Sequence, residues 1–199
     1  ALKLLARAKK AGCTTLVLTV DLPILAERYR DIRNGLSASD NSTTLLAKLK
    51  RGVDIACHPR WLWDVAIQGK PLTFGNLAEV VPNASSLDDL KGWVDSQFDP
   101  SMTWEDLTWI RDNWSGNLVI KGILDKEDAK EAVKLGADAI VVSNHGGRQL
   151  DSASATLSVL PDIVNVIDKR CQIILDGGIR SGVDVIKALA LGADACMLG

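Results

Sequence analysis

The chain has 199 residues, of which 47% are hydrophobic and 24% are charged, as in a folded globular protein and unlike a disordered one. Its 23 Lys and Arg residues nearly balance its 25 Asp and Glu residues, and the resulting net charge of −2 argues against a nucleic-acid-binding surface. No apolar run reaches the roughly 18 residues that span a bilayer, and the length indicates one domain or most of one.

The chain begins within a predicted helix, and a helix-to-strand joint then occurs three times. It reads Lys10-Ala-Gly-Cys-Thr-Thr-Leu-Val-Leu-Thr19, Lys134-Leu-Gly-Ala-Asp-Ala-Ile-Val-Val-Ser143 and Ala190-Leu-Gly-Ala-Asp-Ala-Cys-Met-Leu-Gly199. The glycine in each joint allows the left-handed conformation that ends a helix. The continuous apolar run that follows is typical of a parallel strand covered on both faces.

A long insertion, from about residue 26 to residue 117, follows the first strand and exceeds the length of a single crossover. It is predicted to contain one helix over residues 59–67, which opens at a proline, and another over residues 103–113. Trp61 and Trp63 lie in the first of these helices. We expect them to pack within the fold, and contact with a membrane interface is the alternative.

The second half of the chain alternates between strands and helices. Further strands are predicted at residues 118–121 and 172–175, and helices, with Asp125 as the N-cap of the first, at residues 125–135, 157–168 and 182–191. This alternation indicates right-handed parallel crossovers, in a doubly wound sheet or a (β/α)8 barrel. Because the five predicted strands are fewer than the eight of a barrel, we expect residues 1–199 to form one domain that is an internal piece of a larger protein.

The cysteines do not predict a metal site or a disulfide framework. They are scattered and include no Cys-x-x-Cys pair, so a reducing cytoplasm is the default expectation. Cys57 and His58 resemble half of a metal site, but no second pair stands at ligand spacing. A structural role for both is therefore favoured.

Polar residues occur at the carboxyl end of every predicted strand. The first four strands end in Thr19-Val-Asp21, Lys121-Gly122, Ser143-Asn-His145-Gly-Gly-Arg148 and Asp176-Gly-Gly-Ile-Arg180, and the fifth ends in Gly199. In a barrel these ends converge on one mouth, where active sites are built. Since a buried strand that ends in an unneeded Lys or His loses solvation energy, the coincidence at five strands favours a functional site.

Two of these groups are suited to anions. The turn from Asp176 to Arg180 offers backbone N–H groups and a guanidinium to a phosphate, with a plain glycine-rich turn as the alternative. Lys121 is placed to balance a negative charge that develops during a reaction. The alternative is that its side chain only extends along the barrel rim to reach solvent.

Two other groups are suited to acid–base chemistry and carboxylate binding. His145 is placed to act as a base oriented by Asp21, whereas a structural histidine would be hydrogen-bonded by the backbone of a tight loop. Arg28 and Arg148 suit a bidentate grip on a substrate carboxylate, and the alternative for each is a solvated surface charge.

Together these motifs resemble the FMN-dependent L-2-hydroxy acid dehydrogenase and oxidase family. The matching segments are Thr19-Val-Asp-Leu-Pro with Arg28, Ile120-Lys-Gly122, Ser143-Asn-His-Gly-Gly-Arg-Gln-Leu-Asp151 and Asp176-Gly-Gly-Ile-Arg180. The third segment is highly specific, and the resemblance covers essentially the whole chain. Residues 58–61 and 98–111 most resemble the bacterial respiratory L-lactate dehydrogenase branch.

The resemblance implies an incomplete (β/α)8 TIM barrel, with about five of eight strands, that holds FMN at its mouth. It implies flavin contacts from Thr19, Lys121, Ser143, Asp176, Gly177, Gly178, Ile179, Arg180 and Gly199. It also implies that His145, supported by Asp21, is the general base. Arg28 and Arg148 are implied to bind the substrate carboxylate, although Glu27 stands where many members have a second arginine.

The implied reaction is the oxidation of an L-2-hydroxy acid, with L-lactate favoured, to the 2-oxo acid. Electrons would pass from reduced FMN to a quinone or cytochrome, and a hydride route and a carbanion route are equally compatible with the residues. The alternatives are an oxidase that uses oxygen, a nucleotide dehydrogenase of the inosinate type, for which no cysteine is suitably placed, and a non-catalytic fragment that binds phosphate. We further expect a homo-oligomer when full length, located in the cytoplasm or peripherally at the inner face of the cell membrane.

Overall fold

The structure, a computed structural model, describes residues 1–22, 24, 29, 45–69, 93–94 and 96–199. The chain divides into two compact units. Unit 1 comprises residues 1–26 and 99–199, and unit 2 comprises residues 27–98, which lie within the predicted insertion. In the described parts of both units, no helix combines the length and the apolar character needed to cross a membrane.

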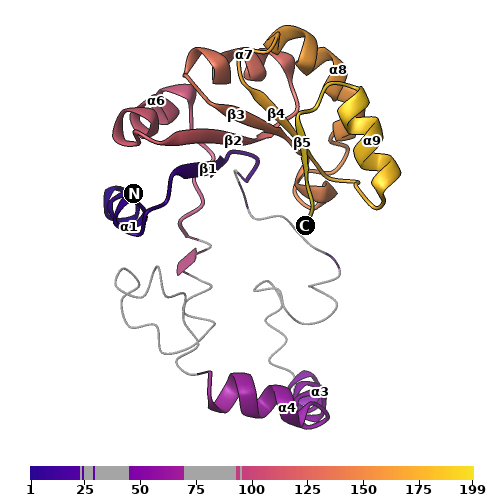
Figure 1. The fold of residues 1–199 in the computed structure, drawn as a ribbon. Coiled ribbons are helices and arrows are strands. Elements are labelled where there is room, and N and C mark those ends of the chain that lie inside the picture. The colour runs from indigo at the N-terminus through magenta and orange to yellow at the C-terminus, as the bar shows by residue number, and fades with distance from the viewer. Residues whose placement is uncertain (23, 25–28, 30–44, 70–92, 95) are drawn as a thin grey trace. The chain divides into compact units, whose positions relative to one another are not determined.

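Unit 1 is built on a parallel sheet whose strands lie in the order in which they occur along the chain (Figure 1). The strands are β1 (Thr15–Thr19), β2 (Asn117–Ile123), β3 (Ala139–Val142), β4 (Gln172–Asp176) and β5 (Ala195–Met197). A doubly wound sheet reverses its direction of growth at a switch point, whereas a barrel adds its strands in sequence. The order β1-β2-β3-β4-β5 therefore matches part of a (β/α)8 barrel.

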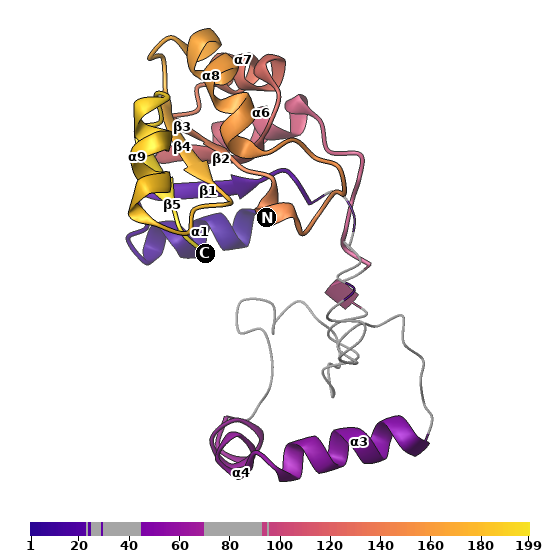
Figure 2. The same ribbon diagram turned by 90° about the vertical axis from the view of Figure 1, so that its right-hand side faces the viewer.

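Helices connect the strands and cover one face of the sheet (Figures 1 and 2). They are α6 (Trp104–Asn113), α7 (Lys126–Lys134), α8 (Thr156–Ile167) and α9 (Gly182–Ala190), and α1 (Leu2–Lys10) precedes β1. The bounds of α6, α7, α8 and α9 were predicted to within about two residues, and α1 was predicted without bounds. The N-cap predicted for α7 is confirmed, because the Asp125 carboxylate accepts hydrogen bonds from the backbone N–H groups of Glu127 and Asp128.

The alternation of side chains along the strands separates the main core from the face that carries the predicted site. The main core packs the helices against alternate strand residues, which include Leu118, Ile120, Ile140, Val142, Ile173 and Leu175. On the opposite face, a smaller cluster contains Val119, Val141 and Ile174. Residues two apart share a face, so Lys121, Ser143 and Asp176 continue this smaller cluster toward the carboxyl ends of their strands.

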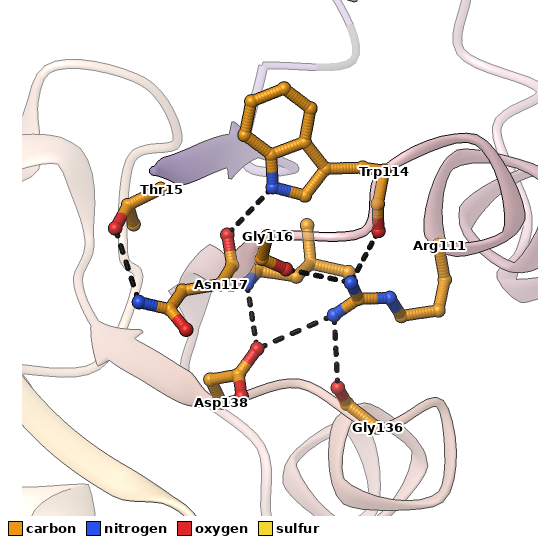
Figure 3. Close-up of polar contacts among 8 residues, drawn as sticks. Thr15, Arg111, Trp114, Gly116, Asn117, Gly136 and Asp138 are labelled. Atoms are coloured by element: carbon orange, nitrogen blue, oxygen red, sulfur yellow. Dashed lines mark hydrogen bonds and ion pairs between the residues drawn. The ribbon is translucent and has the colours of Figure 1, made fainter. Parts of the chain in front are cut away.

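A polar network around Arg111 joins the amino ends of β1, β2 and β3 (Figure 3). The guanidinium of Arg111 donates to the backbone carbonyls of Trp114 and Gly116, the latter at 2.7 Å, and lies 3.3 Å from Asp138 Oδ2. The indole of Trp114 donates to the carbonyl of Asn117 at 2.9 Å. This network lies at the strand ends opposite to the predicted site and fixes the start of β2.

The repeated Gly-Ala-Asp joint has a structural reason. Gly136 and Gly192 adopt φ values of +81° and +103°, the left-handed region that favours glycine. The carboxylates of Asp138 and Asp194 then accept the backbone N–H of the second residue in the strand alongside, at 2.8 Å in β2 and 2.7 Å in β4. Each joint therefore ends a helix and fixes the register of the strand that follows against its neighbour.

The described part of unit 2 contains α3 (Leu45–Ala56), α4 (Pro59–Trp61) and a π-helical segment, η1 (Leu62–Ile67). The helix predicted to open at Pro59 is present, although most of it is π-helical. The prediction that Trp61 and Trp63 pack within the fold is wrong, because they are 48% and 56% exposed. Aromatic residues in a helix can form one surface, but the sequence does not say whether another element covers that surface.

Candidate active site

Three predicted side chains from three neighbouring strands meet at the carboxyl edge of the sheet. Lys121 Nζ lies 3.0 Å from Ser143 Oγ and 3.0 Å from Asp176 Oδ2. Ser143 donates a hydrogen bond of 3.0 Å to the same Asp176 oxygen. The side chains of Lys121 and Asp176 are only 14% and 18% exposed, so this is a largely buried ion pair with a shared hydroxyl. The predicted convergence of these strand ends is confirmed for these three residues.

Ser143 is the hub of this cluster. Its hydroxyl accepts hydrogen bonds from Lys121 Nζ and, at 3.1 Å, from the backbone N–H of His145, while it donates to Asp176. A serine hydroxyl has one donor and two acceptor positions, so its capacity is fully used. Ser143 is also 0% exposed. The hydroxyl therefore links Lys121 and Asp176 to the backbone of the loop that begins at His145, and the flavin contact implied for Ser143 stays a prediction.

His145 and Asp21 form a second pair beside this cluster. His145 Nδ1 lies 3.1 Å from Asp21 Oδ1, and both side chains are largely buried. His145 begins the short η2 turn (His145–Gly147) after β3 and has a φ of +58°, a left-handed conformation that is uncommon outside glycine. Its backbone N–H bond to Ser143 supports this conformation. With Nδ1 facing a carboxylate, Nε2 is the nitrogen positioned for proton exchange.

The other carboxylate oxygen of Asp21 lies in a buried environment. Asp21 Oδ2 is buried and has no hydrogen-bond partner within the described part of the chain. A buried carboxylate that lacks a full set of donors is stabilised by a nearby positive charge. Within the described residues, the contact with His145 Nδ1 is therefore the side-chain interaction of this carboxylate.

The charge of Asp176 depends on its partners. Burial raises the pKa of this carboxyl, but hydrogen bonds from Lys121 and Ser143, together with the lysine charge, outweigh burial and leave the pKa below its ordinary value. A carboxyl with a depressed pKa in the folded state stabilises the fold fully above the unfolded-state pKa of about 3.9. That contribution is lost as the pH falls through the lower, folded-state pKa.

We therefore expect Asp176→Asn to destabilise the protein at neutral pH and to matter less in acid. The difference in free energy of unfolding between wild type and variant should shrink as the pH falls from about 4 through the lower, folded-state pKa, below which the wild-type carboxyl is neutral as well. Urea unfolding over a pH series measures this difference. A difference that stays constant from neutral pH to acid would contradict the ionised state assigned to Asp176.

The glycine turn after β4 is open toward solvent on one side. Gly177 and Gly178 have φ values of +91° and +76°. A Cβ at Gly177 would lie 3.0 Å from Asn144 Oδ1, whereas a Cβ at Gly178 would meet no atom within 4 Å. Left-handed turns of this kind can present backbone N–H groups to an anion. The side chain of Ile179 packs against the main core, and Arg180 is exposed.

For the remaining predicted residues that it describes, the structure gives a position in the fold. Thr19 pairs with Lys121 in the register of β1 and β2. Arg148 follows the η2 turn and is exposed, and Gly199 lies two residues beyond β5, which ends earlier than predicted. Arg28 lies outside the described residues, so the structure does not test the predicted arginine pair.

Sequence reasoning missed the role of Asn144. Its side-chain oxygen accepts the backbone N–H of Gly147 at 3.2 Å, and its amide donates to the carbonyl of Ser154 at 3.2 Å. The residue thus shapes the loop that carries His145. An Asn directly before a His-Gly-Gly segment is a signal for such a side-chain-to-backbone turn.

The chain matches known proteins along its whole length. The profile of the family described as FMN-dependent dehydrogenase matches residues 1–199. The L-lactate dehydrogenase of Actinobacillus pleuropneumoniae serotype 5b (strain L20) is 52% identical over 195 residues, which cover 98% of this chain and 50% of that protein. The L-lactate dehydrogenase of Xanthomonas oryzae pv. oryzae (strain PXO99A) is 51% identical, with coverage of 98% and 49%.

The chain is also similar to solved structures. A crystal structure of (S)-mandelate dehydrogenase, described as a monotopic membrane protein, has a TM-score of 0.84 at 38% identity and matches 100% of this chain and 50% of its own. A mandelate oxidase structure with (S)-mandelic acid has a TM-score of 0.67 at 36% identity, with coverage of 100% and 44%. The chain thus spans about half the length of the curated relatives it matches. Since the family profile extends from the first residue to the last, the chain belongs to the FMN-dependent dehydrogenase family.

Proposed function

We propose that the protein containing this chain oxidises an L-2-hydroxy acid to the 2-oxo acid with FMN. L-lactate is the favoured substrate, because the two relatives described above are L-lactate dehydrogenases. The observation that carries the proposal is the pairing of His145 with Asp21 at 3.1 Å, linked through Ser143 to the Lys121–Asp176 pair. This arrangement supports a base beside a cation at one edge of the sheet.

The described residues fit FMN. Lys121 supplies a positive charge suited to the flavin carbonyl region, and Thr19 lies beside it in register. The open glycine turn after β4 supplies a left-handed backbone suited to a phosphate. We assign flavin binding to this set, which consists of Thr19, Lys121, Ser143, Asp176, Gly177, Gly178, Ile179, Arg180 and Gly199. When bound, FMN supplies the acceptor for the two electrons that leave the substrate.

The residues of this chain supply the proton chemistry and the orientation of the substrate. His145 Nε2 takes a proton from the substrate, from the hydroxyl in a hydride route or from C2 in a carbanion route. Asp21 holds the ring through Nδ1 and stabilises the imidazolium. Arg148 binds the substrate carboxylate, and we assign Arg28 to the same anion from the sequence alone.

The test is anaerobic reduction of the flavin in the full-length protein. L-lactate should bleach the yellow absorbance of bound FMN, and D-lactate should not, because the base and the flavin define one face of the substrate carbon. Failure of every short L-2-hydroxy acid to bleach the flavin would contradict the proposal. Equilibrium dialysis of the 199-residue chain with FMN tests the alternative, a non-catalytic fragment that binds only phosphate. Tight binding of FMN by this chain would contradict that alternative.

The electron acceptor is part of the same proposal. We assign a quinone or cytochrome, because the chain resembles the respiratory branch of the family in residues 58–61 and 98–111. Reoxidation of the reduced protein by a soluble quinone should be much faster than by oxygen. Fast turnover with oxygen alone would instead identify an oxidase.

We also propose that unit 2 contacts a membrane surface. Trp61, Trp63 and Ile67 are exposed on α4 and η1, and one solved relative is described as a monotopic membrane protein. Indole rings partition favourably into the interfacial region of a bilayer. Trp63→Ala should weaken co-sedimentation with anionic vesicles, whereas Trp109→Ala, which removes an exposed tryptophan of unit 1, should not. Equal effects of the two substitutions would contradict this proposal.

A further inference from the structure

Gly122 makes a close approach to the side chain of Asp21. It follows Lys121 on β2 and has a φ of +110°, a conformation that favours glycine. A Cβ built at this position would lie 2.7 Å from both Cβ and Cγ of Asp21 and 3.0 Å from the Asp21 backbone nitrogen. Carbon atoms do not approach this closely without displacement. The Asp21 side chain therefore occupies space that is free only because residue 122 is glycine.

The Asp21 carboxylate has little freedom in this position. Its Oδ1 lies 3.1 Å from His145 Nδ1, and its Oδ2 is buried. A Cβ on residue 122 would press on Cβ and Cγ, the atoms that aim the carboxylate at the imidazole. Any shift that relieves the contact would change the distance or the angle of the Asp21–His145 pair.

We propose that Gly122 is a positioning residue, which lets Asp21 lie against β2 in the one place from which its carboxylate orients His145. Gly122 acts through Asp21 and touches neither substrate nor flavin in this role. The inference rests on the proposed function, in which His145 is the base. Sequence reasoning named Gly122 as the end of a strand and as part of a matching segment, and gave it no role of its own.

Gly136 provides a matched control for backbone strain. Its φ is +81°, so an alanine there is also forced into the left-handed region, but a Cβ would meet no atom within 4 Å. Gly122→Ala and Gly136→Ala both place an alanine at a positive φ, +110° and +81°, and only Gly122→Ala brings the new Cβ against Asp21. The Asp21–His145 distance in each variant shows whether an effect of Gly122→Ala comes from that contact.

The experiment compares both variants in the full-length protein loaded with FMN. Gly122→Ala should lower kcat roughly 100-fold, as expected for displacement of a catalytic group by about 1 Å, with flavin content retained and KM changed much less. Gly136→Ala should leave kcat within about twofold of wild type, since no site atom moves. A crystal structure of Gly122→Ala should show the Asp21–His145 distance lengthened beyond hydrogen-bond range. Equal kinetics for the two variants, or an unchanged distance, would overturn the proposal.

A double-variant cycle with Asp21→Gly tests the route of the effect. Asp21→Gly removes the two carbon atoms at 2.7 Å and leaves only the backbone nitrogen at 3.0 Å, so adding Gly122→Ala to it should lower the remaining kcat far less than it lowers the wild-type kcat. If Gly122→Ala alone does not fold, the double variant should recover folding and flavin binding. A double variant that does not fold, or whose losses multiply, would overturn the proposal.

The same cycle separates this inference from the proposed function. If Asp21→Gly leaves flavin reduction by L-lactate intact, the assignment of the Asp21–His145 pair is wrong, and the inference fails with it. If Asp21→Gly impairs reduction but Gly122→Ala behaves like Gly136→Ala, only the inference is wrong.

Discussion

His145→Ala is expected to lower the rate of flavin reduction by an L-2-hydroxy acid by about 10⁴-fold, the upper range for removal of a general base. FMN should stay bound, because the His145 side chain contacts Asp21, whereas the flavin is assigned to the Lys121–Asp176 edge and the turn after β4. The backbone N–H bond from residue 145 to Ser143 survives the substitution. Stopped-flow absorbance under anaerobic conditions measures the rate, and the flavin spectrum measures occupancy.

Two further variants make this result interpretable. His145→Asn retains a residue that tolerates the left-handed backbone, so it should match His145→Ala in rate if the imidazole is what matters. His58→Ala removes the only other histidine, an exposed side chain in unit 2 that bonds the carbonyl of Asp54, and should not alter the rate. Loss of flavin from His145→Ala would show that the residue has a binding role instead.

Lys121→Met is expected to have the second-largest effect, on both flavin reduction and stability. The substitution removes a cation placed to balance negative charge on the reduced flavin, which should slow reduction roughly 10²- to 10³-fold and weaken FMN binding. It also leaves the Asp176 carboxylate with only Ser143 as a side-chain donor in this cluster. Breaking a largely buried pair in this way should reduce the free energy of unfolding by about 3 kcal/mol.

A second substitution separates these two effects. In Lys121→Met/Asp176→Asn the unpaired charge is gone, so much of the stability should return, whereas flavin reduction should stay slow because the cation is still missing. Lys130→Met is the control, because Lys130 pairs with Glu127 on the surface and such pairs contribute less than about 1 kcal/mol. Normal flavin reduction by Lys121→Met would contradict the role assigned to this lysine.

The features that the sequence predicted are those with a local physical cause. The Asp125 cap, the left-handed glycines of the joints and the continuous apolar strands each depend on residues a few positions apart, and the structure confirms them. The convergence of Lys121, Ser143 and Asp176 was also predictable, because parallel strands bring their carboxyl ends to the same edge.

The features that only the tertiary structure decided depend on contacts between distant segments. The pairing of Asp21 with His145, 124 residues away, was predicted from the strand ends, but its geometry depends on β2 lying between β1 and β3. The same packing buries Ser143 and brings Gly122 against Asp21. In unit 2, Trp61 and Trp63 are exposed, although helical spacing alone favoured burial. The sequence by itself therefore determined the strands, the caps and the chemistry at the strand ends, whereas the strand order and the side chains that touch across it were decided by the fold, since no local pattern encodes which segments become neighbours.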